Sequence, residues 1–206
     1  MKHEDRFADV RATALLAFHD EGVRDSAFAS GPPVHAEEPW AAIEENHRRN
    51  VQLWDSEDQA RRTDVPEGTI VACKRAIDRH NQARNDAVER IDEALLARLA
   101  DVVPAADAWQ NSETAGAMAD RLSILALKVH HMGLAARAAG AAPAHRAACA
   151  EKAARIALQR DDLARCYDRL LDAAAAGRAF WRVYRQFKMY NDPALNPYLK
   201  GGRAGV

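Results

Sequence analysis

The sequence predicts an all-α fold, a single-domain bundle of about six helices. Hydrophobic residues make up 48% of the 206-residue chain but aromatic residues only 6%. Alanine, the strongest helix former, is the commonest apolar residue. Glycine and proline number only 10 and 8 and gather at a few breaks. Apolar residues recur every three to four positions between these breaks, which is the helical period, and the length fits one domain.

The first helix is predicted over residues 4–22, where Phe7, Val10, Ala14 and Phe18 share one face. Gly-Pro-Pro at 31–33 then breaks the pattern. Two adjacent prolines cannot continue a helix, so residues 26–38 are expected to form a surface loop.

The later helices follow from the remaining breaks. Pro66 has the sequence context of a first helical residue, and Pro104 follows the end of the longest periodic segment. The predicted helices cover about 40–62, 66–99, 112–139, 144–176 and 178–190. Within one domain (1–206), residues 1–38 are expected to form an N-terminal helix and loop, 39–190 the core bundle, and 191–206 a C-terminal loop and tail.

Composition excludes several classes of protein. The 29 basic and 30 acidic residues give a net charge of -1 without long runs of one sign, so no nucleic-acid partner is expected. No apolar segment approaches the roughly 20 residues needed to span a bilayer, and no signal peptide is recognisable. A cytoplasmic protein without membrane contact is therefore expected. Its three widely spaced cysteines are expected to be reduced core residues.

Polar residues occupy the apolar faces of two successive helices, where amphipathic helices normally exclude them. On a helical wheel the apolar face of segment 40–62 also carries His47, Asn50, Trp54, Glu57, Asp58 and Arg61. In segment 66–99 the apolar stripe has, in it or beside it, Lys74, Asp78, Asn81, Arg84, Asn85 and Asp92. Burying such groups costs several kcal/mol unless each is paired. The pattern predicts a buried polar network or a ligand pocket.

Two further segments are expected to complete that pocket. The helix over 112–139 is apolar around most of its circumference and should be central; it carries Arg121, Lys128 and, in an apolar row, His131. The segment QFKMYNDPALNPYL near the C-terminus places two residues before prolines, which stiffens a loop. This loop is expected to set Lys188, Tyr190, Asn191 and Asp192 at the pocket mouth.

Four motifs, in order along most of the chain, resemble the bacterial family catalogued as domain of unknown function 4254. They read NVQLWDSEDQAR, KRAIDRHNQARNDAVERID, ETAGAMADRLSILALKVHHM and YRQFKMYNDPALNP. Ahead of the first motif the family commonly has a Glu and a Phe where this sequence has Arg48 and Val51, so no role is carried over for that Glu. The resemblance implies an association with cell-surface polysaccharide synthesis, and hence with sugars or nucleotide sugars.

The leading hypothesis is an enzyme that acts on a small anionic metabolite, phosphorylated or linked to a sugar or nucleotide, in glycan or secondary-metabolite biosynthesis. The candidate acid–base residues are Glu57, Asp58, Asp78 and His131. The candidate substrate-binding residues are His47, Asn50, Trp54, Arg61, Lys74, Asn81, Arg84, Asn85, Arg121, Lys128, Lys188, Tyr190, Asn191 and Asp192.

Two alternative functions stay open. The same polar residues can form a purely structural network, with the chain acting as a non-catalytic protein that binds a partner through its helices. A metal-dependent enzyme like the all-α nucleotide pyrophosphohydrolases would bind Mg²⁺ or Mn²⁺ through carboxylates such as Glu89 and Asp92, although nothing in the sequence requires a cofactor. A homodimer paired through Phe7 and Phe18 is possible under any of these readings.

Overall fold

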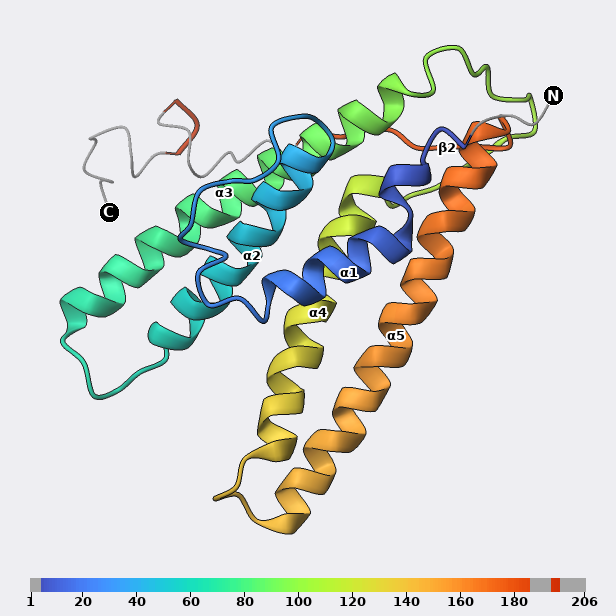
Figure 1. Ribbon diagram of the computed structural model, residues 1–206. Helices are drawn as coiled ribbons and strands as arrows, with labels where there is room; N and C mark the ends of the chain where they lie inside the picture. The colour runs from blue at the N-terminus through green and yellow to red at the C-terminus, as the bar shows by residue number, and fades with distance from the viewer. Residues whose placement is uncertain (1–4, 186–193, 197–206) are drawn as a thin grey trace, which may run out of the picture.

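The computed structural model describes residues 5–185 and 194–196 and confirms the all-α single-domain fold. The described chain forms five α-helices, a short 3-10 turn and two very short strands (Figure 1). In chain order these are η1 (Ala8–Val10), α1 (Ala12–Gly22), α2 (Trp40–Gln59), α3 (Glu67–Ala97), β1 (Trp109–Gln110), α4 (Ala115–Arg137), α5 (Pro143–Ala175) and β2 (Ala179–Phe180).

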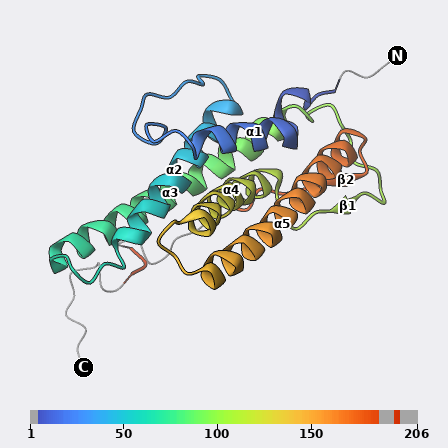
Figure 2. The same cartoon turned by 60° about the horizontal axis from the view of Figure 1, so that its bottom comes forward.

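Two helical hairpins make up the bundle. The elements α2 and α3 pack along each other, as do α4 and α5, and α1 lies across them (Figures 1 and 2). The helix α4 contacts all four other helices, as its apolar circumference predicts. Figure 1 shows that the second half of α4 diverges from α2 and α3, which opens the bundle on that side.

Large side chains from all five α-helices, together with Phe7 just before η1, fill the core. Phe7, Leu15, Leu122 and Tyr167 are fully buried there. Phe18 packs edge-on against the indole ring of Trp40 at the start of α2, 5.4 Å between ring centres. Both phenylalanines that the sequence offered for a dimer interface are thus engaged within this chain.

Residues 178–185 are not helical, so the expected last helix is wrong over this range. Gly177 has a φ of +68°, a left-handed conformation that favours glycine, and it ends α5. The chain then runs beside the α3–α4 connection, where β1 and β2 pair in parallel with Trp109 opposite Ala179. The rest of the expected helix, 186–190, lies outside the described residues.

The cysteines differ in their surroundings, which corrects the expectation that all three are core residues. Cys149 is buried, Cys73 is half-buried and Cys166 is exposed, and all three are free thiols. Among the described residues no helix combines the length and apolar character needed to cross a membrane.

Candidate functional site

A pocket of about 290 Å³ lies between α2, α3 and α4, where the bundle opens. The hypothesis from the sequence assigns a ligand pocket to the same three helices. Its walls combine apolar, aromatic and charged side chains. They are Asn50, Leu53, Trp54, Glu57, Asp58, Arg61, Arg84, Ile124 and Leu127.

The indole ring of Trp54 forms the aromatic wall of the pocket. It stacks on the His131 imidazole of α4, with ring centres 4.4 Å apart and planes within 9° of parallel. The Trp54 Nε1 is buried and has no hydrogen-bond partner among the described residues. Burial, helped by the neighbouring His130, lowers the pKa of His131 below its usual range. The imidazole is therefore neutral near pH 7 and can accept a proton.

Two arginines line the pocket. Arg84 of α3 lies deep, with its Nε 3.5 Å from Asp120 Oδ1 and without a hydrogen bond to any described residue. Arg61 lies at the exposed rim and its Nη1 donates to Glu57 Oε2 at 2.8 Å. Asp58 is an exposed carboxyl beside that pair. The deep cation is therefore only loosely engaged, whereas the rim cation already has a carboxylate partner.

A buried polar network centred on Asp120 of α4 supports the pocket floor. Asp120 Oδ1 accepts from Asn46 Nδ2 at 2.8 Å and from Asn50 Nδ2 at 2.9 Å. Asn50 Nδ2 also lies 2.9 Å from Ser123 Oγ, which is 2.7 Å from His47 Nδ1. These four partners are almost fully buried. The network holds Asn50 and Arg84 in place where their side chains face the pocket.

The network ends in a pair of neutral histidines. The rings of His47 and His19 lie 4.6 Å apart, and burial lowers the pKa of His47 to about 4 and that of His19 well below its usual range. Gly22 permits this approach, because a Cβ there would lie 2.8 Å from the His47 ring. His47 thus supports the network beneath the pocket and does not line the pocket itself.

Other residues expected at the site lie elsewhere. Lys74, Asp78 and Lys128 are exposed, and Arg121 is exposed and paired with Glu113. None of these four residues lines the pocket, contrary to the expectation from the sequence. On α3, the contacts with α4 lie near Arg84 and Asp92, beyond the first turns that carry Lys74 and Asp78. Asn81 is half-buried on α3 without lining the pocket. Lys188, Tyr190, Asn191 and Asp192 lie outside the described residues.

Sequence reasoning missed Asn46, Asp120 and Ser123 as site residues. Asn46 lies one helical turn before Asn50, and Asp120 and Ser123 interrupt an apolar helix. Polar residues in those positions were a usable signal. The structural role of Glu44 was also missed. Its carboxylate accepts hydrogen bonds from the backbone of Val34 and His35 and from the Arg48 guanidinium. Arg48 thus has a structural role, holding the loop after α1 against α2.

A smaller pocket of about 140 Å³ lies on the other side of α3 and includes Asn85, Glu89 and Asp92. The buried Asp92 Oδ1 accepts from Gly116 N at 2.7 Å, at the first turn of α4. Burial raises the pKa of Asp92 from 3.8 to about 6, against hydrogen bonds that lower it. The carboxyl at this pocket is therefore costly to ionise in the folded protein.

Asp92→Asn should change how stability depends on pH. Because the folded-state pKa is raised, Asp92 favours folding most below pH 3.8 and loses that contribution as pH rises through about 6. The asparagine variant lacks this loss. The difference between its free energy of unfolding and that of the wild type should therefore shift in favour of the variant between pH 4 and 7, by at most about 3 kcal/mol. Urea unfolding at several pH values measures the difference. Parallel curves for the two proteins would contradict the assignment.

Within residues 5–185 and 194–196, no group of three or more His, Cys, Asp or Glu side chains is placed to hold a metal ion. The two carboxylates proposed from the sequence, Glu89 and Asp92, both line the smaller pocket, but each already has another partner. Asp92 is committed to the start of α4, and Glu89 lies 3.9 Å from Arg185. The described part of the chain therefore offers no ligand set for the metal-dependent alternative.

Comparison with known proteins identifies a family for this chain without a known activity. Residues 40–183, which include α2 to α5 and the whole pocket, match the family model described as "Protein of unknown function (DUF4254)". No curated protein and no solved structure matches the chain.

Proposed function

The chain belongs to the DUF4254 family of proteins of unknown function, and we propose that it is an enzyme that acts on a small anionic metabolite bound between α2, α3 and α4. The observation that carries this proposal is the pairing of Trp54 with a deep, loosely engaged Arg84 in one pocket. An aromatic wall beside convergent polar groups is characteristic of small-molecule sites.

The shape and lining of the pocket favour a ligand with a compact ring. A volume of about 290 Å³ is at the low end for ligand sites, which suits one sugar or one base rather than a large cofactor. Leu53, Ile124 and Leu127 complete an apolar wall around the Trp54 indole. Sugar rings and bases both pack against such a surface, and Asn50 offers the amide that would orient a hydroxyl or carbonyl group.

The charges favour an anionic group on that ligand. The Arg84 Nε has only a 3.5 Å contact with Asp120, and Asp120 already accepts from two asparagines. A phosphate or carboxylate could form shorter, charge-assisted hydrogen bonds with the remaining guanidinium nitrogens. The substrate class proposed is therefore a sugar or nucleotide with a phosphoryl or carboxylate group.

Acid–base chemistry is assigned to groups near the pocket. Glu57 is paired with Arg61, whereas Asp58 has no ion pair with a described residue and lines the same rim. Asp58 is proposed to take or give the proton directly, and the neutral His131 behind Trp54 is the second candidate.

A thermal-shift screen tests the proposal. Wild-type protein is heated with nucleotides, nucleotide sugars, sugar phosphates and shikimate-type acids, each with and without Mg²⁺ or Mn²⁺. A ligand at 100 times its dissociation constant adds about 2.7 kcal/mol of stability, which raises the midpoint by several degrees. Trp54→Ala should abolish the shift, whereas Trp109→Ala, a matched control at a half-exposed tryptophan on β1, should keep it.

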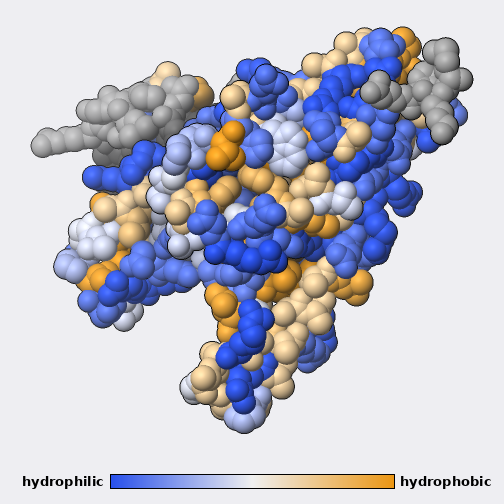
Figure 3. Space-filling model, in the orientation of Figure 1, coloured by the Kyte–Doolittle hydropathy of each residue, from blue (hydrophilic) through white to orange (hydrophobic). Residues whose placement is uncertain are grey.

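The other hypotheses make different predictions in the same screen. A hit that requires Mg²⁺ or Mn²⁺ would favour the metal-dependent alternative. A blank panel with a stable protein, or a hit that survives Trp54→Ala, would refute the proposed site. A partner-binding protein should expose a broad apolar surface, but the most apolar residues form separate spots on the face in Figure 3 and the exposed ones belong to different elements.

A further inference from the structure

A second cavity, of about 400 Å³, lies on another face of α4, between the end of α1 and the facing parts of α4 and α5. It shares no lining residue with the pocket at Trp54. Small side chains of α4 and α5 line its apolar part, with alanine at 126, 153, 154 and 157. Its polar lining is mostly cationic.

Arg160 forms a fixed cation in the wall of this cavity. Its side chain is only 9% exposed, and its Nη1 donates to Asp20 Oδ1 at 2.8 Å while Nη2 donates to the Leu16 carbonyl at 3.1 Å. Its Nε is buried and has no partner among the described residues. Asp20 neutralises this one guanidinium and is the only carboxylate in the described lining.

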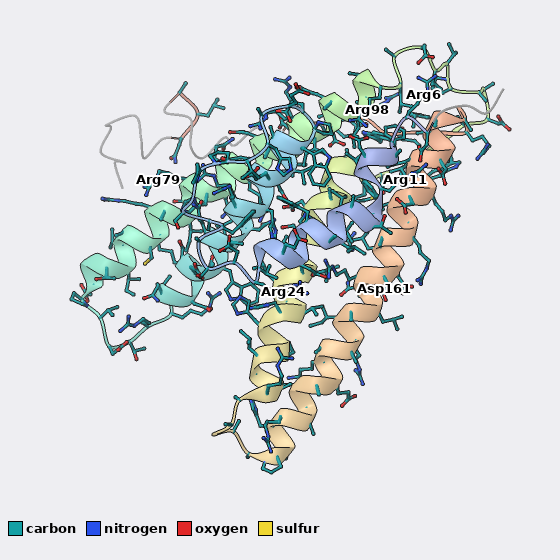
Figure 4. All side chains as sticks on the ribbon, viewed as in Figure 1. Arg6, Arg11, Arg24, Arg79, Arg98 and Asp161 are labelled. Carbon is teal, nitrogen blue, oxygen red and sulfur yellow. The ribbon has the colours of Figure 1, made fainter. Side chains whose placement is uncertain are left out.

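Two more guanidinium groups line the same cavity, and no carboxylate of the described residues forms an ion pair with them. Within the described part of the chain, the side chains of Arg24 and Arg137 have neither an ion pair nor a hydrogen bond. Figure 4 shows Arg24 where α1 ends, beside α4. Arg137 folds back over Gly133, its Nη1 3.3 Å from where a Cβ of that glycine would lie. The glycine therefore leaves room for a guanidinium against the helix.

We propose that this cavity is a second ligand site, for a small molecule that carries phosphoryl or carboxylate groups on a compact apolar body. Arg24 and Arg137 would bind the anionic group, because guanidinium forks match both oxyanions. The ring of His130, which also lines the cavity, would donate a further hydrogen bond. The alanine wall would take the apolar body. This inference does not depend on the function proposed for the Trp54 pocket.

Isothermal titration with inorganic pyrophosphate and with citrate tests the site. The salt concentration is kept at about 0.15 M, which screens contacts with scattered surface charges. The variants are Arg24→Ala/Arg137→Ala, the charge control Arg155→Ala, and Trp54→Ala. Arg155 is an exposed residue of α5 paired with Glu151, and it does not line the cavity. Thermal midpoints of all variants show whether each one is folded.

We expect saturable binding of at least one probe with one site per chain. The double variant should weaken it at least tenfold, and the other two variants should leave it unchanged. Tighter binding of pyrophosphate would indicate that the site takes phosphoryl ligands. Tighter binding of citrate would indicate that it takes carboxylate ligands. Absence of saturable binding of both probes, or equal weakening by Arg155→Ala, would overturn the site. The site would also be overturned if Trp54→Ala abolished binding while the Arg24→Ala/Arg137→Ala variant kept it, because the anion would then occupy the first pocket.

Discussion

Asp120→Ala is expected to destabilise the protein by about 3 kcal/mol, because it removes the shared acceptor of a buried network. Asn46 and Asn50 both donate to Asp120 Oδ1, and Arg84 lies 3.5 Å from it. Two buried amides would lose their acceptor, and one cation its ion-pair partner, at once. Urea unfolding measures the loss.

Two matched variants separate this effect from the loss of any carboxylate. Asp120→Asn keeps an oxygen acceptor and should cost only about 1 kcal/mol. Asp161→Ala removes an exposed carboxylate of α5, labelled in Figure 4, and should change stability by less than about 0.5 kcal/mol. A loss below 1 kcal/mol for Asp120→Ala would show that the network is not stabilised as described.

Gly116→Ala is expected to cost about 2 kcal/mol even though alanine favours helices. Gly116 lies in the first turn of α4, where that helix meets α3. A Cβ there would lie 2.5 Å from the Val88 carbonyl oxygen and 2.8 Å from Asp92 Oδ2. The backbone oxygen cannot move away cheaply, so α4 has to shift from α3 and the Gly116 N to Asp92 hydrogen bond lengthens.

Gly68→Ala is the control for this prediction. Gly68 lies in the first turn of α3, and a Cβ there would have nothing within 4 Å. It should be neutral or stabilising by up to about 1 kcal/mol, the usual helical gain. If both glycine variants gained stability, the close packing of α3 against α4 at Gly116 would be contradicted.

The residues that α2 contributes to the pocket wall follow from the periodicity of that one helix. Helical periodicity alone places Asn50, Trp54 and Asp58 on one face, and the structure finds all three in the pocket wall. Arg84 also lines this pocket, and it continues the buried stripe of α3 through Ile77. These residues depend only on the geometry of one helix and on the packing of two neighbours.

The position of α4 relative to α2 and α3 could not be predicted in this way. Whether Asp78 or Asp92 is buried depends on where α4 crosses α3, and the period of α3 carries no information about that crossing. Asp92 meets the start of α4 and is buried, whereas Asp78 stays exposed. Asp120 was likewise recognisable as a polar residue in an apolar helix, but its partners Asn46 and Asn50 come from α2, 74 and 70 positions away.

The segment after α5 shows a second limit. Residues 178–185 have helical composition, yet they follow the left-handed Gly177 and are not helical: Ala179–Phe180 pair with β1, and 181–185 have no regular secondary structure. A strand pair of two residues each has no periodicity to detect. Its partner, Trp109, lies in a connection whose path depends on the whole bundle.

The central claim is that a ring-bearing anion binds between Trp54 and Arg84. The most direct measurement is a crystal structure of the protein with the strongest hit from the thermal-shift screen. The account predicts the ring of the ligand against the Trp54 indole and its phosphate or carboxylate within hydrogen-bond distance of Arg84. A ligand bound elsewhere, with this pocket empty at saturating concentration, would contradict it.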